Sequence, residues 1–238
     1  YNTSIGQAAG DAYTTGSRNT GVGYFALSET TTGAYNVAVG MNALDDNTTG
    51  ERNTAVGAYS LDVTTTASNN TAIGYYALQA NTTGANQVAV GCNALDVNTT
   101  GAYNVAVGSG ALGANTTASS NTAIGYQALL VNTTGANNTA IGAQALDANT
   151  ASANTAIGQA AGGANTTGAN NVFVGAAAGV LNTTGSYNVS VGRDALYSNT
   201  TGDYNTAIGY EVLEDNTADG NTALGASALK NNTTGANN

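Results

Sequence analysis

A seventeen-residue pattern is repeated without interruption along the chain, and one clear copy is the segment 121–137, NTAIGYQALLVNTTGAN. Fourteen copies follow one another, and only the ninth and thirteenth are one residue shorter. The copies begin at Asn2, Asn19, Asn36, Asn53, Asn70, Gln87, Asn104, Asn121, Asn138, Asn154, Asn171, Asn188, Asn205 and Asn221. A fixed period of this length is typical of stacked coils that contact only their neighbours. The repeat therefore predicts a single all-β parallel solenoid over residues 1–238, with fourteen coils, as a segment of a longer fibre.

The first five positions of the repeat form its strongest strand pattern. Position two is always Thr or Val, position four is always Ile, Val or Leu, and position five is always Gly, as in Gly6, Gly125 and Gly225. Because side chains alternate along a strand, positions two and four share one face, and positions three and five share the other. We expect the branched face, with Ile124, to point into the core, and the small face to admit another backbone. Glycine at position five fits either this close approach or a turn with positive φ.

The rest of the repeat combines an Ala-Leu pair with an Asn-Thr-Thr-Gly segment. We interpret Ala-Leu at positions eight and nine, as in Leu129, as a second short strand or a bend that points Leu inward. A helix is disfavoured by the short length and the flanking Gly and Asn residues. Asn and Gly accept turn conformations, so the chain should reverse at Asn-Thr-Thr-Gly. Stacking would place Asn121 and Asn132 in columns of identical amides that hydrogen-bond along the stack.

The composition excludes several classes of function. The chain has a formal net charge of −10, no histidine and no proline. Its four basic residues, Arg18, Arg52, Arg193 and Lys230, form no basic stripe, which argues against nucleic acid as a partner. No apolar run is long enough to insert into a membrane. A lone cysteine, Cys92, excludes an intrachain disulfide, and its variable position in the repeat favours a tolerated small residue over a reactive thiol.

Enzymatic chemistry has little support in the sequence. Without histidine, acid–base catalysis would need paired carboxylates, and the acids are scattered over the repeats. Six acids occupy position ten: Asp11, Asp45, Asp62, Asp96, Asp147 and Glu214. Stacked carboxylates repel one another, so this column should face solvent. We predict no catalytic residue, no cofactor and no metal.

One group of acids has two interpretations. Glu211, Glu214, Asp215 and Asp219 lie close together in the sequence. They could hold a weakly bound Ca²⁺ ion through their carboxylate oxygens. A solvated acidic patch is the alternative, and it is favoured because the spacing matches no calcium-binding loop.

Tyrosines gather at two positions of the repeat. Position six holds Tyr24, Tyr75, Tyr126 and Tyr210, and position seventeen holds Tyr1, Tyr35, Tyr103, Tyr187 and Tyr204. Exposed aromatic columns can stack on sugar rings or on a receptor, or they can simply pack beside the Asn columns. The candidate binding residues are Tyr35, Tyr103, Tyr187 and Tyr204. Nine Asn-Thr-Thr triplets also satisfy the N-glycosylation pattern, although the turn alone would produce it.

The segment GANNTAIGAQAL at 135–146 resembles the head repeats of YadA-type trimeric autotransporter adhesins, and similar repeats occur in phage tail fibres. The likeness covers essentially the whole chain. It implies a left-handed parallel β-roll, trimerisation, exposure on a cell surface or virion, and a binding or spacer role. The repeats of this chain depart from that family by a few additional residues in each unit, namely the x-x-Asn-Thr-Thr segment.

The leading hypothesis is a non-enzymatic extracellular fibre segment that acts as a rigid spacer and contacts receptors or glycans. We expect a homo-oligomer, with a trimer favoured, in which the small Ala and Gly faces of the copies meet. One alternative is an ice-binding solenoid, which would need two outward Thr columns on one flat face. The other is a filament that assembles through its open ends.

Overall fold

The computed structural model describes residues 1–238 and contains strands, turns and bends but no helix. Each repeat forms one coil, and each coil has a single three-residue strand at positions two to four of the repeat. The chain divides into two compact parts, which we call the N-terminal stack (Tyr1–Ser120) and the C-terminal stack (Asn121–Asn238). The predicted all-β parallel solenoid is confirmed, and each stack is described separately below.

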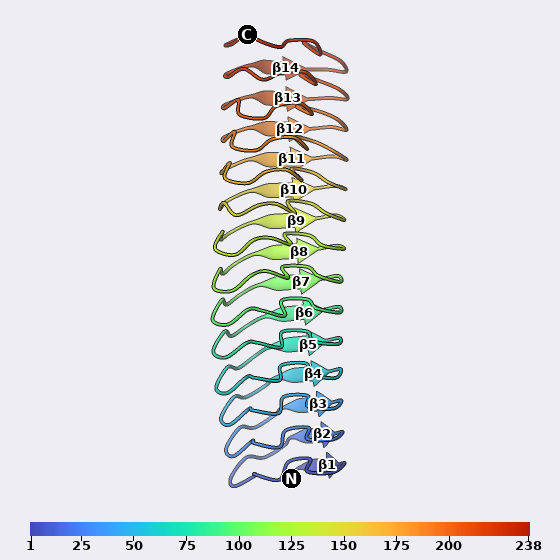
Figure 1. Ribbon diagram of the computed structural model, residues 1–238, viewed down its shortest axis with the longest axis vertical. Coiled ribbons are helices and arrows are strands. Elements are labelled where there is room, and N and C mark those ends of the chain that lie inside the picture. The colour runs from blue at the N-terminus through green and yellow to red at the C-terminus, as the bar shows by residue number, and fades with distance from the viewer. The chain divides into compact units, whose positions relative to one another are not determined.

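The N-terminal stack contains seven parallel strands in sequence order. They are β1 (Thr3–Ile5), β2 (Thr20–Val22), β3 (Val37–Val39), β4 (Thr54–Val56), β5 (Thr71–Ile73), β6 (Val88–Val90) and β7 (Val105–Val107). Each strand pairs with the next, and equivalent positions of the repeat lie opposite one another, as Thr54 lies opposite Thr71. The blue to green ribbon in Figure 1 shows these coils lying one above another. Every column of the repeat is therefore a column in space within this stack.

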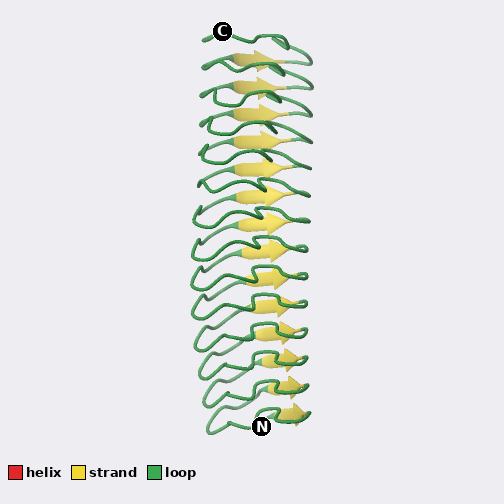
Figure 2. Cartoon of the chain, viewed as in Figure 1, coloured by secondary structure: helices red, strands yellow, loops and turns green.

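The C-terminal stack has the same construction. Its strands are β8 (Thr122–Ile124), β9 (Thr139–Ile141), β10 (Thr155–Ile157), β11 (Val172–Val174), β12 (Val189–Val191), β13 (Thr206–Ile208) and β14 (Thr222–Leu224). The ninth repeat is one residue short, yet Thr139 still pairs with Thr155. The missing residue is taken from the segment that contains the bend at 151–153, outside the strands, which Figure 2 draws in yellow. The bend absorbs the deletion without a change of strand register.

The inward side of the strand is the small face, which corrects our expectation that the branched residues fill the core. Ala123 is fully buried, whereas Ile124 retains 38% of its surface exposed. The interior is narrow at position three: a Cβ added to Gly21 would lie 3.4 Å from Cδ1 of Leu27 and 3.2 Å from the carbonyl oxygen of Ala26. A methyl group fits this space and a branched side chain does not, so the branched residues point outward.

Leucine at position nine fills most of the remaining interior, as predicted for Leu129, which is fully buried. The segment is a turn and not a second strand, and Leu129 has a left-handed φ of 52°. A left-handed backbone costs a residue with a side chain roughly 1–2 kcal/mol. Burial of a leucine contributes about 1.5–3 kcal/mol, which offsets that cost.

Three coils have glycine at position nine, and in each of them an aromatic ring occupies the space of the missing leucine. A Cβ added to Gly162 or Gly179 would lie 2.5 Å or 2.3 Å from ring carbons of Phe173. Similarly, a Cβ on Gly10 would lie 2.2 Å from Cε2 of Tyr13. Phe173 is the only bulky residue at position three, so one ring replaces two leucines.

Glycine at position five satisfies both of the requirements that the sequence left open. Gly125 has a φ of 135°, a conformation that side chains disfavour. A Cβ on Gly125 would also lie only 2.6 Å from the carbonyl oxygen of Gly142 in the next coil. Turn geometry and close stacking therefore act together to require glycine there.

Buried asparagines line positions one and twelve of the coils, which confirms the predicted Asn columns, although position twelve is Tyr13, Thr30 and Thr64 in three coils of the N-terminal stack. At position one, the Oδ1 of Asn121 accepts a 2.9 Å bond from the backbone N–H of Asn138. At position twelve, the amides bond directly to one another, as where Nδ2 of Asn182 donates to Oδ1 of Asn165 at 2.7 Å. Asn132 departs from this prediction: its Nδ2 donates to the carbonyl oxygen of Gly135 in its own coil at 2.8 Å, and its Oδ1 accepts no hydrogen bond from the next coil. Asn132 therefore closes its coil, whereas Asn121, Asn165 and Asn182 also link neighbouring coils.

Candidate functional site

An apolar surface runs along each stack on the outward strand face, which we define as positions two and four of every coil. Its aliphatic residues are partly exposed: Val39 retains 38% of its surface, Ile73 40% and Ile141 37%. No charged residue occupies positions one to five in any repeat. Parallel pairing in register makes the face a continuous row of aliphatic side chains within each stack. The alternation of the sequence predicts this row, but the row lies on the outside of the coil and not in the interior expected for Ile124.

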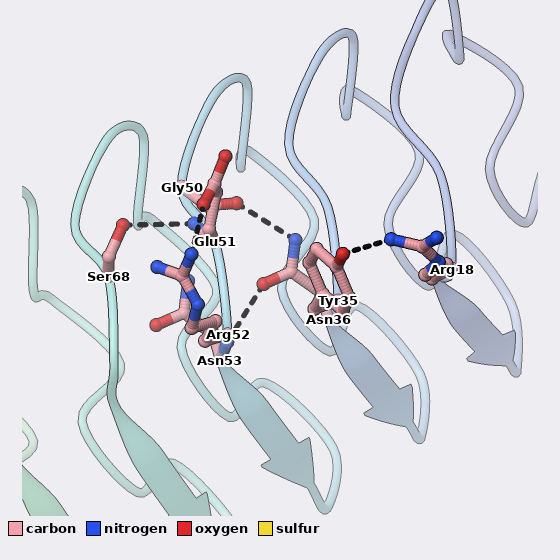
Figure 3. A network of polar contacts seen from close by, with 8 residues as sticks. All are labelled: Arg18, Tyr35, Asn36, Gly50, Glu51, Arg52, Asn53 and Ser68. Carbon is pink, nitrogen blue, oxygen red and sulfur yellow. Dashed lines mark hydrogen bonds and ion pairs between the residues drawn. The ribbon is translucent and has the colours of Figure 1, made fainter.

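A second surface lies at position seventeen, directly before the strand. In the N-terminal stack this column contains Arg18, Tyr35 and Arg52 on consecutive coils. The guanidinium carbon of Arg18 lies 5.0 Å from the ring centroid of Tyr35, and that of Arg52 lies 6.0 Å from it. Arg18 also donates a hydrogen bond to the Tyr35 hydroxyl (Figure 3). We call this group, with exposed Asn69, Asn86 and Tyr103 further along, the position-seventeen column.

In the C-terminal stack, the same position brings Tyr187 and Tyr204 together. Their ring centroids are 5.0 Å apart, and the ring planes are inclined by only 4°. Tyr35 and Tyr103, in contrast, contact no other tyrosine ring of their column. All four candidate tyrosines are exposed, Tyr103 and Tyr204 most strongly, at 64% and 63%. They form one stacked pair and two separate aromatic sites.

Tyrosines at position six gather near the turn that follows the strand. Tyr75 stacks obliquely on Tyr76, with ring centroids 4.1 Å apart, and Tyr59 packs against both rings. Tyr24 and Phe25 form a similar pair in the second coil. These rings border the outward strand face on the side opposite position seventeen, because position six follows the strand and position seventeen precedes it.

The acidic group of the thirteenth coil is organised around a lysine. Nζ of Lys230 forms ion pairs with Glu211 and Glu214, the latter at 2.8 Å. Hydrogen bonds from Lys230 and Tyr210 lower the pKa of Glu211, while the two carboxylates raise the pKa of Lys230. Asp219 points elsewhere and accepts a 2.9 Å bond from the backbone of Asp203. The structure contains no group of three or more acids, His or Cys arranged for a metal.

The position-ten acids are half-buried where they stack. Partial burial is the main cause that raises the pKa of Asp62. A hydrogen bond from Gln79 lowers this pKa, and the neighbouring charges of Asp45 and Asp46 raise it. Burial also raises the pKa of Asp147, and that of Asp46 at position eleven, where the charge of Asp45 contributes as well. These carboxyls sit on the outer wall of the coil and carry a small electrostatic cost.

Eight of the nine Asn-Thr-Thr triplets have an asparagine that is closed to modification in the folded chain, and the asparagine of the ninth, Asn232, is partly exposed. The eight buried asparagines are Asn47, Asn81, Asn98, Asn115, Asn132, Asn165, Asn182 and Asn199. The first threonine of the triplet is also engaged, as where Oγ1 of Thr82 donates to the carbonyl oxygen of Thr99 at 3.0 Å. The second threonine, such as Thr83, is exposed. Glycan transfer to the eight buried asparagines requires an unfolded coil.

Other features of the surface are simple. Cys92 is a free, exposed thiol whose Sγ lies 2.9 Å from Oδ1 of Asn93. The structure has no pocket, and none of its segments forms a helix with the length and hydrophobicity to cross a bilayer.

Comparison of the chain with protein-family models, with curated proteins and with solved structures found no match.

Proposed function

We propose that the chain is a segment of a non-enzymatic extracellular fibre in which several copies associate and act as a rigid spacer with an adhesive surface. One observation carries the proposal: the uncharged outward strand face runs through every coil of each stack and is exposed to water in a single chain. Soluble monomers rarely leave contiguous apolar patches larger than a few hundred Å² uncovered. A second copy with the same row and the same spacing is the partner that matches it best.

The copies would meet through positions two and four and not through the Ala and Gly face, because Ala123 and its equivalents line the inside of the coil. The interface would resemble the apolar centre of a homo-oligomer, from which charges are absent. The flanking tyrosines, such as Tyr75 and Tyr103, would form its rim. We favour a trimer on the cell surface or virion because the repeat resembles the heads of trimeric adhesins.

Solution mass tests this assembly. We expect the 23.3 kDa chain to elute with a mass near three times the monomer when measured by light scattering after size exclusion. The triple variant Val39→Lys, Val56→Lys and Ile73→Lys places charges on the outward strand face and should give monomers that retain the circular dichroism of the parent. A wild-type chain that stays monomeric at high concentration would refute the proposal.

A matched control separates this effect from added charge. Thr49→Lys, Thr66→Lys and Thr83→Lys alters the same three coils at an exposed position away from the strand. This control should associate as the wild type does. If both triple variants are monomeric, the assembly depends on net charge and not on the outward strand face.

Ice binding is a second candidate, and the observation in its favour is the outward Thr column at position two. Thr122 and Thr139 lie in register on β8 and β9 and face outward. Valine interrupts the column in five repeats, and position four supplies aliphatic residues instead of a second Thr column. A thermal-hysteresis assay distinguishes the two: strong activity that is lost in Thr122→Val and Thr139→Val supports ice binding.

A further inference from the structure

The basic residues of this acidic chain are not equivalent. Salt bridges join Arg52, Arg193 and Lys230 to carboxylates. Arg18 has no carboxylate partner and instead bonds to the Tyr35 hydroxyl. Its guanidinium lies over the same ring that Arg52 approaches from the following coil. Two guanidinium groups therefore lie on either side of one exposed tyrosine in a region where the column itself carries no acid.

The backbone at position seventeen makes this arrangement costly. Arg18, Tyr35 and Arg52 have φ values of 61°, 62° and 57°, in the left-handed region. Asparagine and glycine adopt this conformation readily, and asparagine is the residue at this position in five other repeats. For other residues the left-handed backbone costs roughly 1–2 kcal/mol. Leu129 recovers such a cost through burial, whereas these side chains are exposed, as are Ser120 and Ala153, which have a φ of 62° at this position. The charges and the ring of Arg18, Tyr35 and Arg52, and not the backbone, therefore distinguish this part of the column.

We propose that the position-seventeen column of the N-terminal stack binds an acidic polysaccharide that runs along the coils. The inference rests on the adhesive role proposed above and names the ligand class. Guanidinium groups bind sulfate and carboxylate groups through paired, charge-assisted hydrogen bonds. Tyr35 and Tyr103 offer aromatic surface to sugar rings, and Asn69 and Asn86 between them offer amide donors and acceptors.

Glu51 regulates how readily the column accepts an anion. Its carboxylate lies 3.2 Å from Nη2 of Arg52, and its backbone N–H donates to Oγ of Ser68 at 2.9 Å (Figure 3). The ion pair is exposed, with 59% of the Arg52 side chain accessible, so it contributes little stability and can be exchanged. An incoming sulfate or carboxylate takes the place of Glu51 on Arg52 and binds Arg18 directly.

The test uses the full chain immobilised on a sensor, with a size-defined heparin oligosaccharide, a polygalacturonate oligosaccharide and a neutral dextran of equal length as probes. We expect the two acidic probes to bind, more weakly as salt is raised, and dextran to bind at least tenfold more weakly. Arg18→Asn with Arg52→Asn should weaken heparin binding at least tenfold, and Tyr35→Asn at least threefold. These substitutions introduce the residue that other repeats have at this position, so the fold is retained.

Two further variants make the test specific. Glu51→Gln removes the competing carboxylate and should tighten heparin binding about threefold, an effect that a purely structural role would not produce. Arg193→Gln removes one exposed positive charge from the C-terminal stack and should leave binding unchanged. The proposal is overturned if the wild type ignores both acidic probes, if dextran binds equally well, or if Arg193→Gln weakens binding as much as the double variant.

The outcome is independent of the assembly test. A chain that is monomeric yet binds heparin through Arg18 and Arg52 would refute the proposed assembly and support this site. A chain that assembles but binds neither acidic probe would refute only this site. Preference for heparin or for polygalacturonate identifies whether sulfate or carboxylate is the anion recognised.

Discussion

Ala140 and Ile141 are consecutive residues of β9 and meet opposite environments. Ala140 is fully buried, whereas Ile141 has 37% of its surface exposed, although isoleucine is the more hydrophobic of the two. The difference shows that the width of the coil, and not the hydrophobicity of a residue, decides which side of the strand faces inward. The inward side must be small because leucine and asparagine from the rest of the coil already occupy the interior.

The region around Phe173 also indicates that interior volume limits the residues on the inward side of the strand. A large residue is accepted on the inward side only where Gly162 and Gly179 have replaced the leucines that would contact it. The volume of the interior is held nearly constant, while the residues that provide it differ. Because the interior is closely packed, the inward side does not tolerate substitutions that change side-chain volume, whereas the outward side does.

The largest expected effect comes from emptying that interior. Phe173→Ala should lower the free energy of unfolding by about 3–5 kcal/mol because it leaves a cavity beside two glycines. Adding Gly162→Leu and Gly179→Leu should recover most of the loss, since the φ values of 59° and 57° match those of leucine in other coils. Urea unfolding followed by circular dichroism gives both values. A triple variant no more stable than Phe173→Ala would contradict the shared-volume explanation.

The next effect compares the two sides of one strand. Ala140→Val should cost about 3 kcal/mol, because the added methyl groups have no space in a packed interior. Ile141→Val, which removes a methylene group from the outward side, should change the free energy of unfolding by less than about 0.5 kcal/mol. Urea unfolding of both variants, at matched mass by light scattering, tests the contrast. Equal losses would mean that the outward strand face is as tightly packed as the interior.

A smaller effect is expected from the buried amides. Asn182→Ala should cost about 2 kcal/mol, since it leaves the buried Oδ1 of Asn165 without the donor that lies at 2.7 Å. The carbonyl oxygen of Gly185 also loses a bond from Asn182, at 2.9 Å, but keeps one from Nδ2 of Asn171 at 2.8 Å. Thr184→Ala, two residues away and exposed, serves as the outward control and should be nearly neutral. Thermal unfolding should rank the two variants in this order, and the reverse ranking would count against the ladder.

The smallest expected effect is a pH dependence of the unfolding temperature, caused by aspartate carboxyls on the outer wall of the coil. The pKa values of Asp46, Asp62 and Asp147 are raised in the folded chain, chiefly by partial burial. The folded state therefore binds these protons more tightly than the unfolded state, whose aspartates titrate near about 3.9. Their contribution to stability is fully present below that pH and is lost as pH rises through the folded pKa values. Unfolding temperature should increase as pH falls from about 7 to about 4.5.

A control variant isolates those three carboxyls. Asp46→Asn with Asp62→Asn and Asp147→Asn should flatten the pH dependence over the same interval. Glu211 acts with the opposite sign, since hydrogen bonds from Lys230 and Tyr210 lower its pKa. An unchanged slope in the triple variant would show that other groups cause the dependence.

The periodicity of the sequence was sufficient to predict the strands and their pairing. Alternating branched residues located the strand, and the inward Leu129 and the Asn columns followed from the same repeat. The direction of the strand faces could not be predicted, because alternation establishes only that positions two and four point the same way. The choice depends on interior volume, which exists only after the turn and the amides have closed the coil.

Two signals in the sequence could have helped. Glycine at position nine in three repeats and asparagine at position seventeen in five indicate left-handed backbone, which explains the turns that the strand pattern did not predict. The coincidence of Phe173 with Gly162 and Gly179 indicates a shared volume inside the coil. For the candidate sites, the adjacency of Tyr187 and Tyr204 was predictable from spacing, whereas the approach of Arg18 and Arg52 to Tyr35 depends on rotamers that no repeat pattern encodes.

The segment with the bend at 151–153 is one residue shorter than in most coils, while Thr139 and Thr155 keep their pairing. A segment that tolerates a change in length is also a place where foreign peptides or chemical labels can be grafted. Since one such bend recurs in every coil, a stack offers attachment points separated by a single strand spacing, about 4.8 Å. The number of attached groups and the separation between them can therefore be chosen one coil at a time.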